Sequence, residues 1–253
     1  MKLLFPDMRL MNYKSLSQRV RVLSEQWMQE EMYCPSCGRD KLSKFPNNTK
    51  LADFFCEHCG EIYELKSKGQ PIGRTILDGA YYTALERITG LTNPNLFVLQ
   101  YHEYAVENLV LVPKYFFTPD ILQMRNALSS SARRAGYIGS VILYDKIPAH
   151  GKIEIVKSHT ERNKCDVLKN YRRATQLDMK SLESRSWLMD ILKCLDKITC
   201  EIFSLKEVYA FVGELSRKHP DNHNIEAKIR QQLQILRDRG FVEFLGGGKY
   251  KKR

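Results

Sequence analysis

Apolar residues recur at helical spacing near the start of the chain. The stripe predicts a helix that begins after Ser15 and buries Leu16, Val20, Leu23 and Trp27. Ser15 and Gln18 are spaced as a capping box at its first turn.

Two short runs, residues 52–56 and 62–66, alternate along the chain on either side of a Cys-rich turn. This pattern predicts neighbouring β-strands. Because successive side chains of a strand point to opposite faces, Glu64 and Lys66 share one face, while Tyr63 and Leu65 lie on the other. Asp53, on the first run, can meet the charged pair from the paired strand.

The pattern that follows predicts a helix and then more strands. Ile76, Ala80, Ala84 and Ile88 fall on one helical stripe. Apolar, β-rich runs predict strands at 95–101, 109–112, 141–143 and 153–156, which continue a mixed sheet. Residues 157–181 are polar and charged, and we expect a linker there; the alternative is a partly helical segment that touches DNA, because Lys and Arg dominate it. The fold class expected for this part is α/β (α+β).

The remaining residues predict a winged helix. A helix over 186–197 buries Trp187, Ile191 and Leu195, and Ser204 with Glu207 forms a capping box for a second helix. A third helix spans 224–239, and residues 241–252 predict a hairpin with a Gly-rich turn. We therefore expect one domain at 1–182 and a DNA-binding winged helix at 183–253.

The third helix presents a polar face opposite its apolar stripe. Asn or Gln can bond adenine in the major groove, and Ala can lie against a base methyl group. The alternative is a solvated helix in a protein-interaction module. The candidate DNA-binding residues of this part are Asn224, Ala227, Lys228, Arg230, Gln231, Gln234 and, on the hairpin, Lys249.

Charge favours a polyanionic partner. The 253 residues carry a formal net charge of +11, and such a balance is typical of nucleic-acid binders, although many basic proteins bind no polyanion. The sequence contains no run of about 18 apolar residues, the length that could span a membrane. The N-terminal residues do not resemble a signal peptide. We expect a monomer in the bacterial cytoplasm that does not bind membranes.

Four of the seven cysteines form two Cys-x-x-Cys units, Cys34/Cys37 and Cys56/Cys59. This spacing is typical of a zinc ribbon, in which four thiolates complete a tetrahedral shell and leave no open position for catalysis. Free thiols or a redox pair are the alternatives. His58 is expected at the surface, because the four cysteines already fill the shell. A structural Zn²⁺ would fix the loop that carries Asp53.

Asp53, Glu64 and Lys66 have the residue types of a metal-dependent nuclease. Phosphodiester hydrolysis needs charge stabilisation and a hydroxide-like nucleophile, and Mg²⁺ held by carboxylates supplies both. In this scheme Asp53, Glu64 and the Leu65 carbonyl bind Mg²⁺, and Lys66 acts on the attacking water. The alternative is that three charged residues occur at this spacing by chance.

A polar segment, residues 125–139, contains paired arginines beside an aromatic residue. Arg133 and Arg134 can hold phosphates, and Tyr137 can stack or wedge at bases. In the alternative interpretation, Tyr137 packs on the protein core.

Collinear motifs along nearly the whole chain resemble the family of DpnI-like methyl-directed restriction endonucleases. Two departures from the family pattern occur: Ala52 stands in place of the motif's nominal proline, and Tyr137 in place of tryptophan. The matching segments are Tyr13-Lys14-Ser15, Cys34-Pro-x-Cys37, Ala52-Asp53-Phe54, Cys56 and Cys59, Glu64-Leu-Lys-Ser-Lys68, Asp78-Gly-Ala-Tyr81, Ala132-Arg-Arg-Ala-Gly136, Ile229–Asp238 and Gly248-Lys-Tyr-Lys251.

The resemblance implies a catalytic domain of the PD-(D/E)XK nuclease fold with an embedded zinc site, and a C-terminal winged helix. It implies Mg²⁺-dependent cleavage of double-stranded DNA at GATC carrying N6-methyladenine, with Asp53, Glu64 and Lys66 as the catalytic motif. It also implies that both domains can read the methylated site.

Two separate sites that each recognise the methylated base would explain methyl dependence. One buried methyl group contributes about 1 kcal/mol, so a single pocket discriminates poorly, and two readers multiply the preference. The rival functions are a zinc-ribbon and winged-helix regulator without catalysis, and an RNA-processing nuclease, which makes less use of a major-groove helix.

Overall fold

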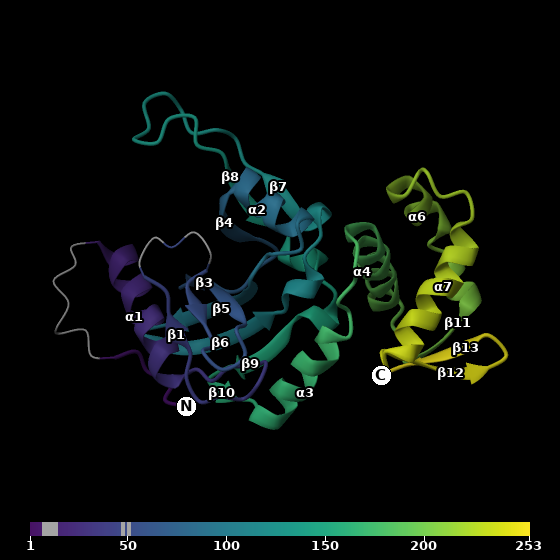
Figure 1. Ribbon diagram of the computed structural model, residues 1–253, viewed down its shortest axis with the longest axis horizontal. Helices are drawn as coiled ribbons and strands as arrows, with labels where there is room; N and C mark the ends of the chain where they lie inside the picture. The colour runs from purple at the N-terminus through teal and green to yellow at the C-terminus, as the bar shows by residue number, and fades with distance from the viewer. Residues whose placement is uncertain (7–14, 47–48, 50–51) are drawn as a thin grey trace.

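A seven-stranded mixed sheet forms the centre of the larger part of the molecule (Figure 1). The structure is a computed structural model that describes residues 1–6, 15–46, 49 and 52–253. In pairing order the strands are β1 (Ser43–Lys44), β2 (Phe54–Phe55), β3 (Ile62–Lys68), β5 (Asn95–His102), β6 (Ala105–Val112), β9 (Ile153–Lys157) and β10 (Thr160–Glu161). Among the described strands of this sheet, only the β3–β5 pair is parallel. The expected α/β fold with a mixed sheet is confirmed.

Two hydrophobic clusters cover opposite faces of this sheet. Tyr63 and Phe97 belong to the cluster beneath helices α1 (Leu16–Glu31) and α3 (Lys164–Thr175). Leu96 and Val98 belong to the other cluster, which includes helix α2 (Tyr81–Thr89). Because side chains alternate along β3, Glu64 lies on the α2 face, opposite Tyr63; its place on the face opposite Tyr63 is as the sequence predicted.

A second, three-stranded sheet lies over the α2 face and corrects two expectations. Its order is β4 (Ile76–Ala80), β8 (Gly139–Ile142) and β7 (Leu122–Met124). The stripe from Ile76 to Ile88 is therefore strand before Tyr81 and helix only after it, because Ile76 pairs with Ile142 in the buried layer. The strand at 141–143 likewise belongs to this small sheet and not to the large one.

The polar segment 157–181 is not a linker. It contains β10 and the helix α3, which buries Val167, Tyr171 and Ala174 against the large sheet. The side chain of Asn163 caps this helix by accepting a hydrogen bond from the Cys165 amide. A few apolar residues at helical spacing therefore fix a segment whose composition is mostly charged.

The start of α1 and the turns between strands complete this part. Ser15 is the N-cap residue of α1, but its side chain makes no capping hydrogen bond, so the expected capping box is not formed. Tyr13 and Lys14 lie outside the described residues. Short 3₁₀ turns occur at η2 (Lys114–Phe116), η3 (Pro119–Ile121), η4 (Tyr144–Lys146) and η5 (Ala149–Gly151).

The C-terminal part is the winged helix that the sequence predicted. Ser204 and Glu207 form the expected capping box, and the hairpin wing pairs antiparallel. The second predicted helix is divided into two short helices. In chain order the elements are α4 (Leu182–Lys197), β11 (Ile202–Ser204), α5 (Leu205–Tyr209), α6 (Val212–Lys218), α7 (Ile225–Asp238), β12 (Val242–Gly246) and β13 (Lys249–Lys252). Within the described residues, no helix is long and apolar enough to span a membrane.

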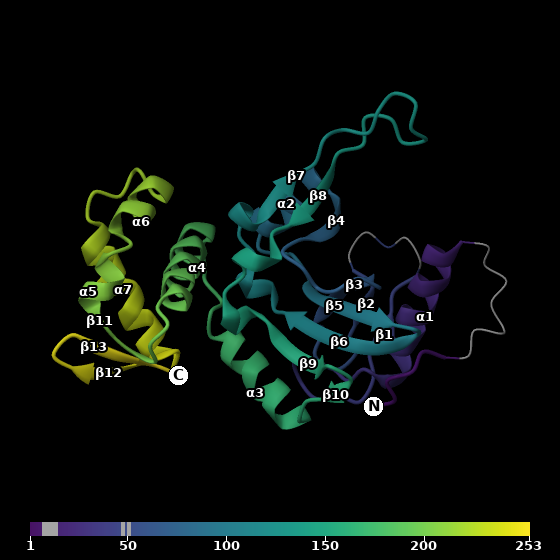
Figure 2. The same cartoon turned by 180° about the vertical axis from the view of Figure 1, so that it is seen from behind.

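Helix α4 lies between the two parts and contacts η2 on one side and α7 on the other (Figure 2). A second contact is made by Arg173 of α3. Its Nη2 donates to the carbonyl oxygens of Gly240 at 2.8 Å and Arg253 at 2.7 Å, and its guanidinium lies over the Phe241 ring, 4.5 Å from the centroid. These contacts hold the base of the wing against the part that contains the large sheet.

We expect Arg173→Met to loosen this contact, because two charge-assisted hydrogen bonds and a cation–π contact are lost together. The free energy of unfolding should fall by about 2 kcal/mol, measured by denaturant unfolding. The neighbouring exposed residue provides a matched control, Arg172→Met. Equal stability of the two variants would contradict this role for Arg173.

Candidate active site and metal centre

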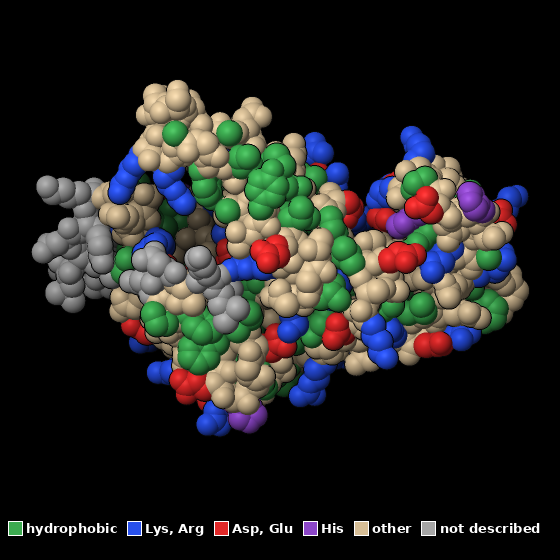
Figure 3. Space-filling model, turned by 45° about the horizontal axis from the view of Figure 1, so that its top comes forward, with side chains coloured by type: hydrophobic (Ala, Val, Ile, Leu, Met, Phe, Trp, Pro, Cys, Tyr) green, Lys and Arg blue, Asp and Glu red, His purple; other side chains and the backbone are tan. Residues whose placement is uncertain are grey.

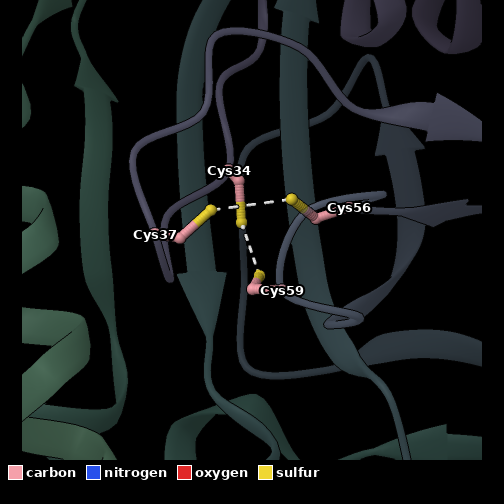
Figure 4. Close-up of side chains that lie close together, drawn as sticks. All are labelled: Cys34, Cys37, Cys56 and Cys59. Atoms are coloured by element: carbon pink, nitrogen blue, oxygen red, sulfur yellow. Dashed lines mark hydrogen bonds between the residues drawn. The ribbon is translucent and has the colours of Figure 1, made fainter.

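The four cysteines of the two Cys-x-x-Cys units come together in space. Their sulfur atoms point toward one another and all lie within 4.8 Å (Figure 4). Cys34 and Cys59 are 3.5 Å apart at sulfur, and Cys37 and Cys56 are 3.6 Å apart. A tetrahedral ion with Zn–S bonds of about 2.3 Å places its sulfurs slightly less than 4 Å apart. This four-cysteine cluster can therefore bind zinc.

Each half of the cluster is a tight turn of the same design. The Gly38 amide donates to the Cys34 carbonyl at 2.8 Å, and the Gly60 amide donates to the Cys56 carbonyl at 2.9 Å. Both glycines have positive φ, 81° and 74°, which an L side chain rarely adopts. Burial would raise the pKa of Cys56, but backbone amides facing its sulfur lower it and favour the thiolate, whereas burial raises the pKa of Cys34 and of Cys59.

The cluster is joined to the β2–β3 hairpin in two ways. Cys56 and Cys59 lie in the turn that connects the two strands, and the Tyr63 hydroxyl of β3 lies 3.1 Å from Cys34 Sγ. Tyr63 also stacks on Phe97, with ring centroids 5.1 Å apart. The four-cysteine cluster thus fixes the position of β3 on the face opposite Glu64.

The hairpin brings the three candidate catalytic residues together. Asp53 precedes β2, and its Oδ2 accepts a hydrogen bond from the Leu65 amide at 2.7 Å. Its own amide donates to the Tyr63 carbonyl at 3.1 Å. Lys66 Nζ lies 2.6 Å from Glu64 Oε1. Two carboxylates, the Leu65 peptide unit and an ammonium group are therefore neighbours on one hairpin, as a cation-dependent hydrolase requires.

Two further charged residues complete the group. Lys66 Nζ lies 2.8 Å from Asp78 Oδ1 of β4, and Arg87 Nη1 of α2 lies 3.7 Å from Glu64 Oε2. The sequence pattern did not reveal either role: residues 76–80 were expected in a helix, and the contact of Arg87 with Glu64 depends on how α2 packs on the sheet. The signal that could have identified Asp78 was its place in the matched Asp-Gly-Ala-Tyr segment.

Partial burial shapes the protonation of this group. Burial raises the pKa of Asp53, the Leu65 amide opposes that effect, and the Glu64 carboxylate adds to it. For Lys66, burial would lower the pKa, but the carboxylates of Glu64 and Asp78 outweigh it and raise the pKa. Burial would raise the pKa of Asp78, but Lys66 keeps it below its usual value. The lysine is therefore an ammonium ion at neutral pH.

A hollow of about 210 Å³ opens beside Asp53. Arg21, Glu25 and Lys44 also line it. The Glu25 carboxylate lies 2.6 Å from Lys44 Nζ and 3.4 Å from Arg21 Nε, so its charge is compensated. Basic side chains of α1 and β1 therefore line the approach to Asp53.

The arm, defined here as residues 125–138, projects from the end of β7 and returns to β8 (Figure 1). Arg133 is exposed at its outer part, and the Arg134 guanidinium lies 4.3 Å from the centroid of the Tyr137 ring. Tyr137 is half-buried, and it stacks with an arginine of the arm itself. The space-filling view shows Lys and Arg side chains around a hollow beside the projecting segment (Figure 3).

Helix α7 exposes most of its candidate DNA-binding residues. Asn224, Ala227, Arg230, Gln231 and Gln234 are exposed, and so is Lys249 of the wing. Two side chains have partners within the domain. Lys228 is half-buried with its Nζ 5.7 Å from the Trp187 ring centroid, and Arg230 donates to the Tyr209 hydroxyl. The candidates on α7 thus share one helix face, Lys249 lies on the wing, and both are separate from the hairpin group.

Comparison with known families covers nearly the whole chain. A sequence model of the DpnI, or Dam-replacing, family matches residues 1–180, and one of the Dam-replacing helix-turn-helix domain matches residues 183–252. The chain belongs to the DpnI family. This membership confirms the resemblance inferred from the sequence motifs, and it implies a DNA-binding restriction endonuclease.

We expect Cys59→Ser to release the metal of the cluster, because three thiolates hold zinc less tightly than four. Bound zinc should fall well below about one ion per chain, with a lower unfolding temperature. Metal analysis and thermal unfolding measure the two effects. Cys200→Ser, at an exposed cysteine outside the cluster, should change neither. Full zinc content in the Cys59 variant would contradict the assignment.

Proposed function

We propose that this chain is a type II, methyl-directed endonuclease that cleaves double-stranded DNA at GATC sites carrying N6-methyladenine. The observation that carries the proposal is the convergence of Asp53, Glu64 and Lys66 on a hairpin closed by the four-cysteine cluster. The family match supports the substrate class. In this proposal residues 1–182 form the catalytic domain, residues 183–253 form the winged helix, and the four-cysteine cluster holds a structural Zn²⁺.

The hydrolysis is proposed to depend on Mg²⁺. When bound, Mg²⁺ supplies positive charge at the scissile phosphate and lowers the pKa of an attacking water. Asp53 and Glu64 provide carboxylate ligands. The Leu65 carbonyl is the third proposed ligand, since the amide and carbonyl of one strand residue face the same side and the Leu65 amide already contacts Asp53. Lys66, which is charged, orients the water by donating a hydrogen bond to it.

The DNA contacts are proposed to come from both parts of the chain. On the arm, Arg133 and Arg134 hold phosphates, and Tyr137 stacks at a base. The exposed face of α7 enters the major groove, where Gln231 and Gln234 bond adenine edges and Ala227 lies against a methyl group. Asn224, Lys228, Arg230 and Lys249 support this docking. Two sites that each prefer methylated DNA multiply a preference that is modest for either alone.

We also propose an oligomeric state and a cellular location. The chain is proposed to act as a monomer in the bacterial cytoplasm, with DNA and no membrane as its partner. The net charge of +11 supports a polyanionic partner. The alternative of a regulator without catalysis explains both DNA-binding parts, but it gives no reason for the partly buried contacts among Asp53, Leu65, Glu64 and Lys66.

The direct test uses one plasmid prepared from adenine-methylating and non-methylating hosts. With Mg²⁺, we expect the protein to linearise and fragment only the methylated plasmid, at GATC sites. Lys66→Ala should cut more slowly by a factor of about 10² to 10⁴, because the group that orients the water is lost. Gel analysis of initial rates measures both effects.

Binding of methylated DNA by Lys66→Ala must remain, so a gel-shift assay in Ca²⁺ is the control for correct folding. If neither plasmid is cut while methylated DNA is bound, the chain is a methyl-reading DNA binder and the nuclease proposal fails. Equal cutting of both plasmids would remove the methyl dependence.

A further inference from the structure

We propose that Asp78 is a positioning residue that holds Lys66 for the attacking water and leaves Glu64 free for the cation. This inference rests on the proposed nuclease function. It concerns a carboxylate that comes from the small sheet, outside the hairpin that carries Asp53, Glu64 and Lys66.

In the structure Lys66 bridges two carboxylates. Its Nζ lies 2.6 Å from Glu64 Oε1 and 2.8 Å from Asp78 Oδ1. The Glu64 and Lys66 side chains are each 23% exposed, and that of Asp78 is 12% exposed. At this depth an ammonium group needs a compensating charge. A glutamate that binds a divalent cation cannot also serve as the sole partner of that ammonium, so a second carboxylate is required.

Asp78 is held in place independently of Lys66. The β4–β8 ladder shifts register between Asp78 and Ala80, and a bulge of this kind changes the direction of a side chain. Ser140, the register partner of Asp78 on β8, is fully buried and donates to the Gly79 carbonyl at 3.0 Å. Its hydroxyl also lies 3.4 Å from Asp78 Oδ2. The carboxylate is therefore aimed at Lys66 by strand pairing.

Arg87 adds a second positive charge beside Glu64. Its Nη1 lies 3.7 Å from Glu64 Oε2, so Glu64 is flanked by two cationic side chains. Asp78 draws the nearer of these, Lys66, toward the small sheet. Without Asp78, the ammonium would have only Glu64 as a carboxylate partner among the contacts that the structure describes, and it would compete with the divalent cation for that group.

The test measures cation binding and cleavage separately. Asp78→Asn keeps the side-chain shape and removes the charge. Mn²⁺ affinity, measured by calorimetry without DNA, should weaken roughly tenfold, because Lys66 now competes for Glu64. Single-turnover cleavage of a methylated GATC duplex at saturating Mn²⁺ should slow about 100-fold, as expected for a misplaced catalytic group. The dissociation constant for that duplex, measured in Ca²⁺ at a saturating concentration, should change by less than about threefold, since Asp78 is not a proposed DNA contact.

A double-mutant cycle decides whether Asp78 acts through Lys66. In a Lys66→Ala background, Asp78→Asn should change Mn²⁺ affinity by less than about twofold and slow the residual cleavage no further. An equal loss of affinity in both backgrounds would mean that Asp78 acts on the cation directly, and it would overturn the proposal. Unchanged Mn²⁺ affinity and unchanged cleavage in Asp78→Asn alone would also overturn the proposal.

Two more variants keep the result interpretable. Asp145→Asn removes a carboxylate that pairs with Arg74 at 2.8 Å, and it should leave all three measurements unchanged. Ser140→Ala removes the hydroxyl beside Asp78 and should shift Mn²⁺ affinity in the same direction by a smaller factor, even if Asp78→Asn folds poorly. An unaltered affinity in Ser140→Ala together with a folded but unaffected Asp78→Asn contradicts the proposal. Failure of the wild-type protein to cut methylated DNA would instead reject the nuclease function, while the Mn²⁺ cycle would still test Asp78.

Discussion

The site depends on the closure of one short hairpin by four cysteine thiols. Strand β2 has only two residues, and its ladder with β3 is too short to fix the position of Asp53 by itself. The four-cysteine cluster closes the turn between the strands, and the Tyr63 hydroxyl beside Cys34 ties β3 to the same cluster. The Asp53 carboxylate can then accept a hydrogen bond from the Leu65 amide, which sets the position of Asp53 relative to Glu64 on β3.

The two faces of β3 have different roles. Tyr63 faces the cluster and the core beneath α1 and α3, so that face supplies rigidity. Glu64 and Lys66 face α2 and the small sheet, which supply the charged neighbours Arg87 and Asp78. The small sheet also carries the arm, and α4 joins the same hydrophobic cluster to the winged helix. The arm therefore lies on the charged side of the sheet, and the winged helix is joined to that side through α4 and to α3 through Arg173.

Local patterns were sufficient to predict the hairpin, the shared face of Glu64 and Lys66, the four-cysteine cluster and the winged helix. These features depend on residues close in sequence or on a spacing that few other structures share. The small sheet was not predicted, because Ile76, Asp78 and Ala80 fit a strand while Ile76, Ala80 and Ala84 fit a helix, and only pairing with residues 139–142 decides between them. Helix α3 was expected only as the alternative to a linker, because its three buried residues stand among many charges. Asp78 and Arg87 reach the site through these long-range contacts, which spacing alone does not reveal.

The central claim is that the hairpin carboxylates hold the catalytic cation, and localised oxidation tests it most directly. Fe²⁺ replaces Mg²⁺ in the protein, peroxide generates radicals at the bound ion, and the cleaved polypeptide is mapped by mass spectrometry. We expect scission close to residues 53 and 64–66, suppressed by excess Mg²⁺ and absent in Glu64→Gln. Scission elsewhere, together with Mg²⁺-dependent DNA cleavage that survives in Glu64→Gln, would contradict it.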